Sequence, residues 1–366
     1  MTSTSRRTVH DLDENSRRVL QLVLQHGPIP RRDLTRLSGL SMPSLTRLTR
    51  PLVLEGYLEE LEPEPTALGR PTQPLALRDG SALVLGVKVV PGALHAVVTG
   101  LRGKVRTTVV RPADTSSPAT TVSALAALAR ELHTTDELFA VGVSLAGAVD
   151  PFGTVRSAVL LGWPKCNFSS QVTEATGLPC TTANDVDALT LAQHWVGLGR
   201  GTENLTVLTL GSGVGAGAVV GGTLAVGYEG FNGMVGDLWC RDGRSYHEVL
   251  STAGIVQRAS AAAGKSLTVE DLRMGLEPLA EPVLADAACV LADLVILARH
   301  TWGPERIVLS GEGIWLLDRH WNQFQESLDW RALHDVDPPE ILVKQLEFTD
   351  WARGAAGLAI RLLLEP

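Results

Sequence analysis

Residues 82–112 read ALVLGVKVVPGALHAVVTGLRGKVRTTVVRP, and this stretch decides the fold class of most of the chain. It holds three short runs of β-branched and apolar residues with turn residues between them, which is typical of consecutive strands. A helical run over 120–133 follows, and then a strand-like run over 138–150 that ends in a loop. Because strands and helices alternate in this way, the sequence predicts an α/β fold.

The rest of the chain continues this alternation. Residues 177–199 predict a strand, a loop and a helix, and residues 204–227 predict two strands around a Gly-rich turn. A long helical stretch over 245–303, a strand at 305–311 and a last helix at 351–365 complete the pattern. A three-strand opening, a helix and a strand, followed by a similar second half, predict two related lobes.

The first 55 residues follow a different pattern, of three helices. Residues 15–26 space their apolar side chains as a helix does, with Asn15 or Ser16 as the expected N-cap and Gly27 after the last turn. A short second helix begins near Pro30, a residue that suits an early helix position.

The third helix carries the side chains of most interest. Gly39 supplies the turn before this helix, and Ser41 is its expected N-cap. Pro51 lacks an N–H and clashes with the preceding turn, so the helix is expected to end near Arg50 or to kink there. The leucines of this helix face inward, and its outward face holds Thr46, Arg47 and Arg50.

Helix, short helix, Gly turn and a helix with outward polar side chains form the helix-turn-helix pattern. Residues 56–61 (GYLEEL) and 73–78 (QPLALR) predict two strands, with Gly69, Arg70 and Pro71 between them. The head is therefore a predicted winged helix-turn-helix. The alternative is a small helical domain that binds other proteins.

The charge distribution favours nucleic acid as the partner of the head. Residues 1–50 hold nine Arg against four acids, a net of +5, and residues 51–80 hold two Arg against six acids, a net of −4. The whole chain carries −8, so the remaining residues carry −9. A basic head on an acidic body indicates a small nucleic-acid-binding module, although a solvated arm has the same charge.

Composition places the chain among globular proteins, with 45% apolar and 20% charged residues. No apolar run is long enough to span a bilayer, and the N-terminus has no apolar stretch of a secretory signal. The four cysteines are widely spaced and form no CxxC pair. These features predict a cytoplasmic protein with free thiols and no membrane partner.

Several segments together resemble one family, the ROK family of repressors, open reading frames and sugar kinases. The head from residue 14 onward is similar to the winged-helix segment of the family's repressors. In the body, SLAGAVD, GLPCTTANDVDAL, LTLGSGVGAGAVVGGTL and GPERIVLSGEG are similar to the family's characteristic segments. The resemblance implies a body of two actin-like lobes, of the ribonuclease H-like or sugar-kinase-like class, with a cleft between them.

The resemblance also implies a division of the chain into three parts. Residues 1–80 are the expected winged helix-turn-helix domain, and residues 196–349 are the expected second lobe. Residues 81–195, with the C-terminal helix 350–366, are the expected first lobe.

The family's kinases need a metal-binding Asp and two glycines in the first strand pair, and the matching stretch here departs from that pattern. Lys88 stands where the Asp is expected, Val90 and Pro91 fill the glycine positions, and Gly100 replaces a second Asp. A lysine cannot hold magnesium, and β-branched and Pro residues obstruct the approach of phosphate. We therefore expect ATP use to be lost or severely weakened, and no cofactor.

Other parts of the kinase pattern survive. The Gly-rich turn Gly211–Gly215 is intact, and Asp185 matches the family's catalytic base. Asn184 and Asp185 also suit the N-cap of the helix that follows them, so the two interpretations stand side by side. An Asp without a metal or nucleotide site is not a kinase.

The stretch GDLWCRDGRSYHEVLS at 236–251 matches the family's zinc-binding loop, but in shortened form. Asp237 stands for a Glu, Cys240 stands for a His that binds sugar and zinc, and the three-cysteine loop is missing. Structural zinc needs four N or S ligands. We expect no metal here, but a turn in which Gly243 makes the bend and Ser245 caps the next helix.

These observations predict a transcriptional regulator, most simply a repressor, that binds a double-stranded DNA operator as a homodimer or higher homo-oligomer. For base edges we expect Ser44, Thr46 and Arg47, for phosphates Arg31, Arg32 and Arg50, and for a minor groove Arg70. A sugar or sugar-derived effector is expected at Gly147, Asn184, Asp185, Asp237 and Glu248. One alternative is a sugar kinase with an appended head, and another is a regulator without a small-molecule ligand.

Overall fold

The computed structural model describes residues 9–63, 72–133, 137–328 and 336–365. They form two compact units, one of Met1–Gly201 with Phe348–Pro366 and one of Thr202–Glu347. The first unit contains the head and the first lobe, and the second unit is the second lobe. None of the helices that the structure describes is long and apolar enough to cross a membrane.

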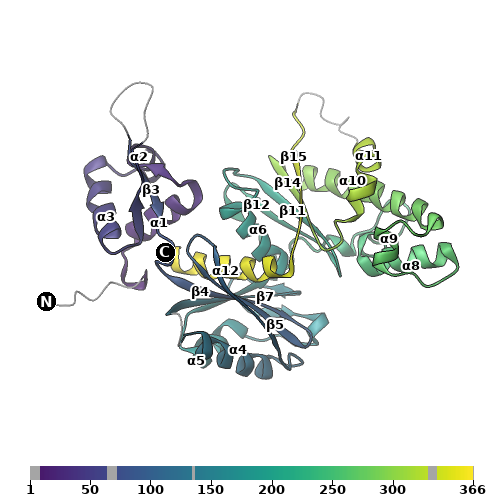
Figure 1. The fold of residues 1–366 in the computed structure, drawn as a ribbon, viewed down its shortest axis with the longest axis horizontal. Helices are drawn as coiled ribbons and strands as arrows, with labels where there is room; N and C mark the ends of the chain where they lie inside the picture. The colour runs from purple at the N-terminus through teal and green to yellow at the C-terminus, as the bar shows by residue number, and fades with distance from the viewer. Residues whose placement is uncertain (1–8, 64–71, 134–136, 329–335, 366) are drawn as a thin grey trace. The chain divides into compact units, whose positions relative to one another are not determined.

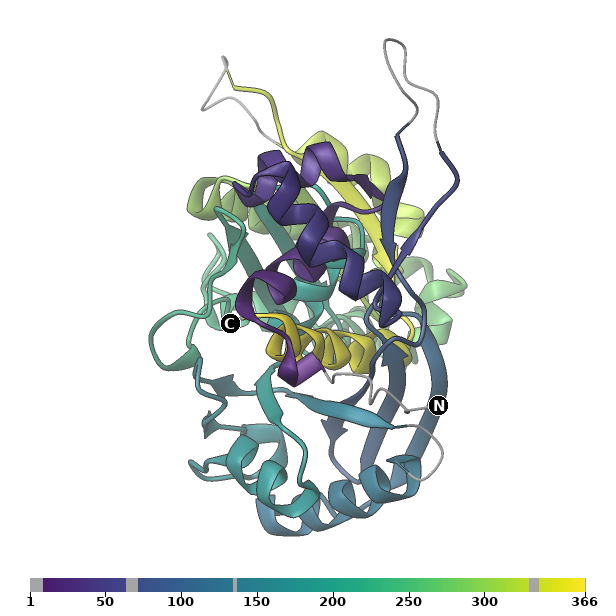
Figure 2. The same ribbon diagram turned by 90° about the vertical axis from the view of Figure 1, so that its left-hand side faces the viewer.

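The head is a three-helix fold with a small sheet, as predicted (Figures 1 and 2). Its three strands are ordered β1-β3-β2, and β2 pairs antiparallel with β3, as the wing prediction requires. The elements are η1 (Val9–Asp11), α1 (Glu14–His26), β1 (Ile29–Pro30), α2 (Arg31–Ser38), α3 (Met42–Leu54), β2 (Leu58–Glu60) and β3 (Pro74–Leu77).

Two local predictions in the head were wrong. Asp13 caps α1, where its side chain accepts a hydrogen bond from the Ser16 amide at 2.9 Å. Neither Asn15 nor Ser16 holds that position. Of the two alternatives at Pro51, an end near Arg50 is wrong, since α3 continues to Leu54 and its buried Leu52 packs in the head core, whereas the kink stays a prediction. Ser41 caps α3 as predicted, and Gly39 before it has a φ of 70°, a conformation that glycine tolerates best.

The first lobe is built on a five-stranded sheet of order β10-β7-β4-β5-β6. Helices α4 and α5 cover one face of this sheet and α12 covers the other (Figure 1). Strands β7 and β10 run parallel to β4, whereas β5 is antiparallel to β4 and β6 is antiparallel to β5. The strands are β4 (Leu83–Val90), β5 (Ala93–Gly100), β6 (Val105–Pro112), β7 (Leu138–Leu145) and β10 (Cys180–Asn184), with the hairpin β8 (Ala148–Val149) and β9 (Val155–Ser157) beside them. The helices are α4 (Pro118–His133), η2 (Val159–Leu161), α5 (Phe168–Thr176), α6 (Asp185–Val196) and α12 (Phe348–Leu364).

The second lobe repeats this plan with a sheet of order β15-β14-β11-β12-β13. Strand β14 runs parallel to β11 and to β15, and β12 is antiparallel to β11, so the pattern of directions matches the first sheet. The prediction of two related lobes is confirmed. The strands are β11 (Leu205–Leu210), β12 (Val214–Val220), β13 (Thr223–Leu224), β14 (Arg306–Gly311) and β15 (Glu340–Gln345). The helices are η3 (Tyr228–Gly230), η4 (Val235–Asp237), α7 (Tyr246–Leu250), α8 (Thr252–Ala263), α9 (Val269–Arg273), η5 (Pro278–Ala280), α10 (Glu281–Trp302) and α11 (Leu316–Ser327).

Helix α12 lies unusually close to the first sheet. A Cβ atom on Gly86 in β4 would lie 2.3 Å from the Ala352 carbonyl oxygen, and one on Gly142 in β7 would lie 1.9 Å from the Ala355 carbonyl oxygen. Such distances are shorter than any van der Waals contact, so only glycine fits at these two strand positions. At these two glycines the backbone of α12 therefore packs directly against the strands.

The head shares a hydrophobic core with the first lobe. Trp195 at the end of α6 and Leu358 and Leu363 of α12 pack in one cluster with the leucines and valines of the head. Beyond α6, the Arg200 guanidinium donates to the Gln25 carbonyl at 2.9 Å and also to the Gly27 carbonyl. These contacts fix the C-terminal end of α1 to the first lobe.

The close packing of α12 predicts that Gly142→Ala destabilises the protein by at least about 2 kcal/mol, because a buried backbone must move to admit the methyl group. The matched control is Gly357→Ala within α12, where the new Cβ meets Ala192 only at ordinary contact distance, 3.6 Å. That change is expected to be neutral or to stabilise the helix by about 0.5–1 kcal/mol. Urea unfolding measures both, and equal effects of the two substitutions would contradict the packing argument.

Candidate ligand site and nucleic-acid interface

The three parallel strands of the first lobe end at the same edge of the sheet. Lys88 near the end of β4 pairs in register with Ser144 of β7, and Asn184 at the end of β10 pairs with Leu145. Open α/β sheets bind ligands outside the carboxyl ends of their strands. The sequence-predicted residues Gly147, Asn184 and Asp185 lie at or just beyond these ends, so the structure brings all three to one place.

A buried ion pair occupies this edge. The Lys88 ammonium donates to the Asp185 carboxylate, and the side chains are only 7% and 13% exposed. The ammonium also lies 5.4 Å from the ring centroid of Trp351 in α12, a cation–π distance. The carboxylate at the position of the catalytic base is therefore already engaged by a cation of the same chain.

Asn184 is engaged as well. Its side-chain amide donates to the Gly147 carbonyl at 2.9 Å, and its side-chain oxygen accepts from the amides of Val186 and Asp187 at 2.8 and 3.2 Å. Asn184 is thus the N-cap of α6, and β10 passes directly into this helix without the predicted loop. The capping interpretation of Asn184 is confirmed.

Asp187 adds a second carboxyl group to the same helix end. Burial, together with the charge of Asp185, raises the pKa of Asp187 to about 8, against an opposing effect of Arg361. The group is therefore mostly protonated at neutral pH. A negative charge at this helix end is carried by Asp185, and Lys88 balances it.

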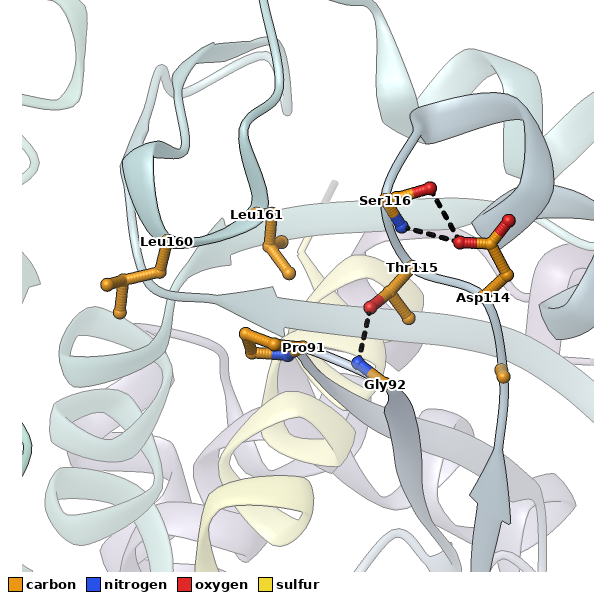
Figure 3. Close-up of a pocket in the computed structure, with 8 residues that line it drawn as sticks. Pro91, Gly92, Asp114, Thr115, Ser116, Leu160 and Leu161 are labelled. Atoms are coloured by element: carbon orange, nitrogen blue, oxygen red, sulfur yellow. Dashed lines mark hydrogen bonds between the residues drawn. The ribbon is translucent and has the colours of Figure 1, made fainter.

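The turn between β4 and β5 is the position at which a kinase would bind phosphate through backbone N–H groups. Pro91 has no N–H, and the Gly92 amide donates to the Thr115 hydroxyl at 2.8 Å (Figure 3). That hydroxyl in turn donates to the Val90 carbonyl at 2.9 Å. Neither Pro91 nor Gly92 therefore offers an N–H to a phosphate.

A hollow of about 260 Å³ lies beside this turn, lined on the other side by Leu160 and Leu161 (Figure 3). Asp114 and Ser116 at its rim bind each other, with the Ser116 amide 3.0 Å from the Asp114 carboxylate. The hydrogen-bonding groups of these lining residues are thus directed at one another. The hollow has the character of a gap between loops.

Asp237 and Glu248, the other two predicted ligand residues, lie in the second lobe. Asp237 is the last residue of η4 and is exposed. The Glu248 carboxylate accepts a hydrogen bond from the Ser245 amide at 2.6 Å, and the Ser245 hydroxyl caps the same turn. This capping box starts α7, so Glu248 has a structural task that its match to a sugar-binding Glu did not reveal.

The shortened loop at 236–251 is held by arginines. The Arg244 guanidinium makes two bonds to the Asp286 carboxylate of α10, at 2.9 and 3.1 Å, and Arg258 donates to the same carboxylate. Burial, with the charge of Asp242, raises the pKa of the Cys240 thiol, which disfavours the thiolate that metals bind. Among the described residues, no three His, Cys, Asp or Glu side chains are grouped to hold a metal ion. Gly243, with a φ of 85°, makes the bend before the Ser245 cap, as predicted.

In the head, α3 presents polar side chains to solvent. Thr46, Arg47 and Arg50 are exposed and Ser44 is half-buried near the N-cap. The Thr46 hydroxyl donates to the Met42 carbonyl at 2.9 Å. In a helix-turn-helix the corresponding helix enters the major groove.

The predicted phosphate contacts differ in their surroundings. Arg31 is only partly exposed, and it donates to the Thr49 hydroxyl at 3.2 Å and to the Glu60 carboxylate at 2.6 Å. It therefore connects α2, α3 and the wing, and its contact with phosphate stays a prediction. Arg32 is exposed, with Asp33 at 3.7 Å. Arg70, the predicted minor-groove residue, lies outside the described residues.

The model of the ROK family matches residues 84–361. The chain belongs to the ROK family. It is 24% identical over 327 residues to the DNA-binding transcriptional dual regulator NagC of Escherichia coli, covering 81% of this chain and 80% of NagC.

Two solved structures show how the ROK fold is shared. A ROK family transcriptional regulator described as a homologue of the E. coli MLC protein superposes with a TM-score of 0.79, at 21% identity, over 96% of both chains. A ROK hexokinase from Thermus thermophilus has a TM-score of 0.64, at 24% identity, over 76% of this chain and 97% of its own. The regulator's match therefore extends over nearly the whole of this chain, whereas the hexokinase matches about three quarters of it.

Comparison with the family pattern had identified Lys88 as a substitution, but the partner of Lys88 was missed. Asp185 lies 97 positions away, so nothing local in the sequence connects the two. The available signal was charge balance. Where a lysine replaces one acid of a site and a second acid of that site is retained, the lysine is expected to pair with the second acid. No such signal in the sequence indicated that Trp351 lies near Lys88 or that Thr115 binds the Gly92 amide.

The buried pair predicts a strong coupling between Lys88 and Asp185. Lys88→Met leaves an unpaired buried carboxylate, and Asp185→Asn leaves an unpaired buried ammonium, so each is expected to lower the free energy of unfolding by about 3–5 kcal/mol. The double variant carries neither charge and is expected to recover a large part of that loss. Urea unfolding of the four proteins gives the coupling energy, and additive effects would show that the pair does not interact.

Proposed function

We propose that this ROK family member is a sequence-specific DNA-binding transcriptional regulator, with residues 1–80 as its DNA-binding domain. The observation that carries the proposal is the outward face of α3, where Thr46, Arg47 and Arg50 are exposed on a winged helix-turn-helix head. The likeness to a ROK transcriptional regulator over 96% of both chains supports it. The direction of regulation that we propose is repression, because a head docked at a promoter excludes other proteins from it.

We assign the exposed side chains of α3 to two kinds of DNA contact, with bases and with phosphates. Arg47 can donate two hydrogen bonds to the O6 and N7 atoms of a guanine, and the Thr46 methyl group suits contact with a thymine methyl. Ser44, closer to the N-cap, completes the proposed base contacts. Arg32 and Arg50 are proposed to bind phosphates, which orient the head without reading sequence. Arg31 is left out of this set because its guanidinium binds Glu60 and Thr49.

We propose further that the protein acts as a homodimer or a higher homo-oligomer. A single head reads only a few base pairs, and two heads related by a twofold axis read two half-sites at a fixed spacing. The operator is therefore expected to be an inverted repeat.

For the body, we propose a sensor without kinase activity. Phosphoryl transfer needs a metal anchor and a free base, whereas here Lys88 replaces the anchor and binds the base, Asp185. The effector we propose is sugar-derived, because the body shares its fold with a ROK hexokinase and because hydroxyl groups are natural donors to a carboxylate such as that of Asp185. Such a ligand has to replace Lys88 as the partner of Asp185.

Helix α6 offers a route from that site to the head. Its first turn holds Asp185, and its far end places Trp195 in the core of the head, next to the Arg200 contacts with α1. A ligand that displaces Lys88 changes the interactions at the first turn of this helix. It then regulates DNA binding if it has different affinities for the free and the DNA-bound arrangement.

Selection of genomic fragments by the purified full chain tests the proposal. The expected result is an inverted repeat whose half-sites are about one helical turn, or a multiple of it, apart. Arg47→Ala is expected to lower affinity by about 1–3 kcal/mol and to relax the preference at one base pair of each half-site. Arg50→Ala is the matched control, since loss of a phosphate contact weakens all sequences alike and reduces the salt dependence.

Two outcomes would contradict this account. Binding that is sequence-blind and strongly salt-dependent would show that the head does not read base edges. A selected site whose preference survives Arg47→Ala unchanged would show that α3 is not the reading helix.

A further inference from the structure

The second Gly-rich turn, Gly211–Gly215, connects β11 to β12 in the second lobe, and its backbone is already engaged. The Gly211 amide donates to the Gly213 carbonyl at 2.9 Å. The next amide, that of Ser212, donates to a carboxylate oxygen of Glu312 at 3.1 Å. Glu312 follows β14, so the turn receives an acidic side chain from a segment 100 positions further along the chain.

The carboxylate lies directly against the backbone of the turn. A Cβ on Gly211 would lie 2.4 Å from both the carboxyl carbon and one oxygen of Glu312, so the carboxylate occupies the space beside Gly211 and would have to move if that residue carried a side chain. On the other side, the Gly313 amide donates to the Leu210 carbonyl at 2.8 Å. Gly311, with a φ of 105°, adopts a conformation that glycine tolerates best, so the glycines on both sides of Glu312 hold it at the turn.

Backbone N–H groups at a Gly-rich turn form a binding site for anions, and here the anion is part of the protein. A phosphate group bound at this turn would need the Ser212 N–H that Glu312 uses. It would also approach a like charge at contact distance, which is unfavourable. The turn at Pro91 and Gly92 is similar, since Pro91 has no N–H and the Gly92 N–H donates to the Thr115 hydroxyl of the same chain.

We propose that the Glu312 carboxylate, which is exposed to solvent, serves as the chain's own anion at the second Gly-rich turn and excludes phosphate groups from it. A ligand of the second lobe therefore carries no phosphate at this turn, and nucleotides do not bind there. The proposal depends on the second lobe alone and stands or falls independently of DNA binding.

The test is titration of the full-length protein with inorganic pyrophosphate, followed by the amide NMR signals of Ser212 and Gly213. In the wild type these signals are expected not to move. In Glu312→Ala they are expected to shift and saturate, with an affinity roughly tenfold or more above that of the wild type, which corresponds to about 1.4 kcal/mol. Glu312→Gln keeps the size of the side chain and removes its charge, so it is expected to gain part of this affinity if the alanine variant folds poorly.

Glu326→Ala is the matched control, since it removes the same charge from an exposed position on α11 in the same lobe and is expected to behave as the wild type. The proposal is overturned if pyrophosphate moves the Ser212 signal of the wild type as strongly as that of Glu312→Ala. It is equally overturned if neither substitution at Glu312 gains binding.

Discussion

At two glycines of the first sheet the backbone of α12 comes into direct contact with the strands, and much of the first unit depends on that contact. Gly86 and Gly142 permit it, because any Cβ at these positions would lie within 2.3 Å of a carbonyl oxygen of the helix. Helix α12 is the last element of the chain, yet it covers the strands β4, β5, β7 and β10 of the first lobe. The first unit is therefore completed by a helix that follows the whole second unit in the chain.

Two further features depend on the position of α12. One end of the helix holds Trp351 above the Lys88 ammonium, and the other contributes Leu358 and Leu363 to the core shared with the head. The ion pair between Lys88 and Asp185 offsets the cost of burying each of these two charges. Asp187 beside them avoids a second charge by keeping its proton, since burial raises its pKa to about 8. The polar groups at this edge of the sheet thus satisfy one another.

The alternation of elements, the two related lobes and the winged head were predictable because they rest on local periodicity and turn residues. Ser41 and Ser245 were recognised as caps for the same reason. The Asp13 cap was missed. The continuation of α3 past Pro51 is accompanied by burial of Leu52 in the head core, a tertiary contact that the local pattern does not show. Tertiary contacts also determine the hydrogen-bond partners of Arg31, Lys88 and Glu312, which lie 29, 97 and 100 positions away in the sequence. No local pattern connects residues over such separations. The structure brings Gly147, Asn184 and Asp185 together, but the partner of Asp185 could not be predicted, and ligand binding at this place stays a prediction.

The central claim is that Asp185 no longer acts as a base because Lys88 occupies it. The most direct test is a phosphotransfer assay of the purified chain with γ-labelled ATP, Mg²⁺ and a panel of hexoses and N-acetylhexosamines, compared with its Asp185→Asn variant. The account predicts no sugar phosphate above the amount formed by that variant. Turnover by the wild type that Asp185→Asn abolishes would contradict it, because the carboxylate would then be free to accept the proton of a sugar hydroxyl.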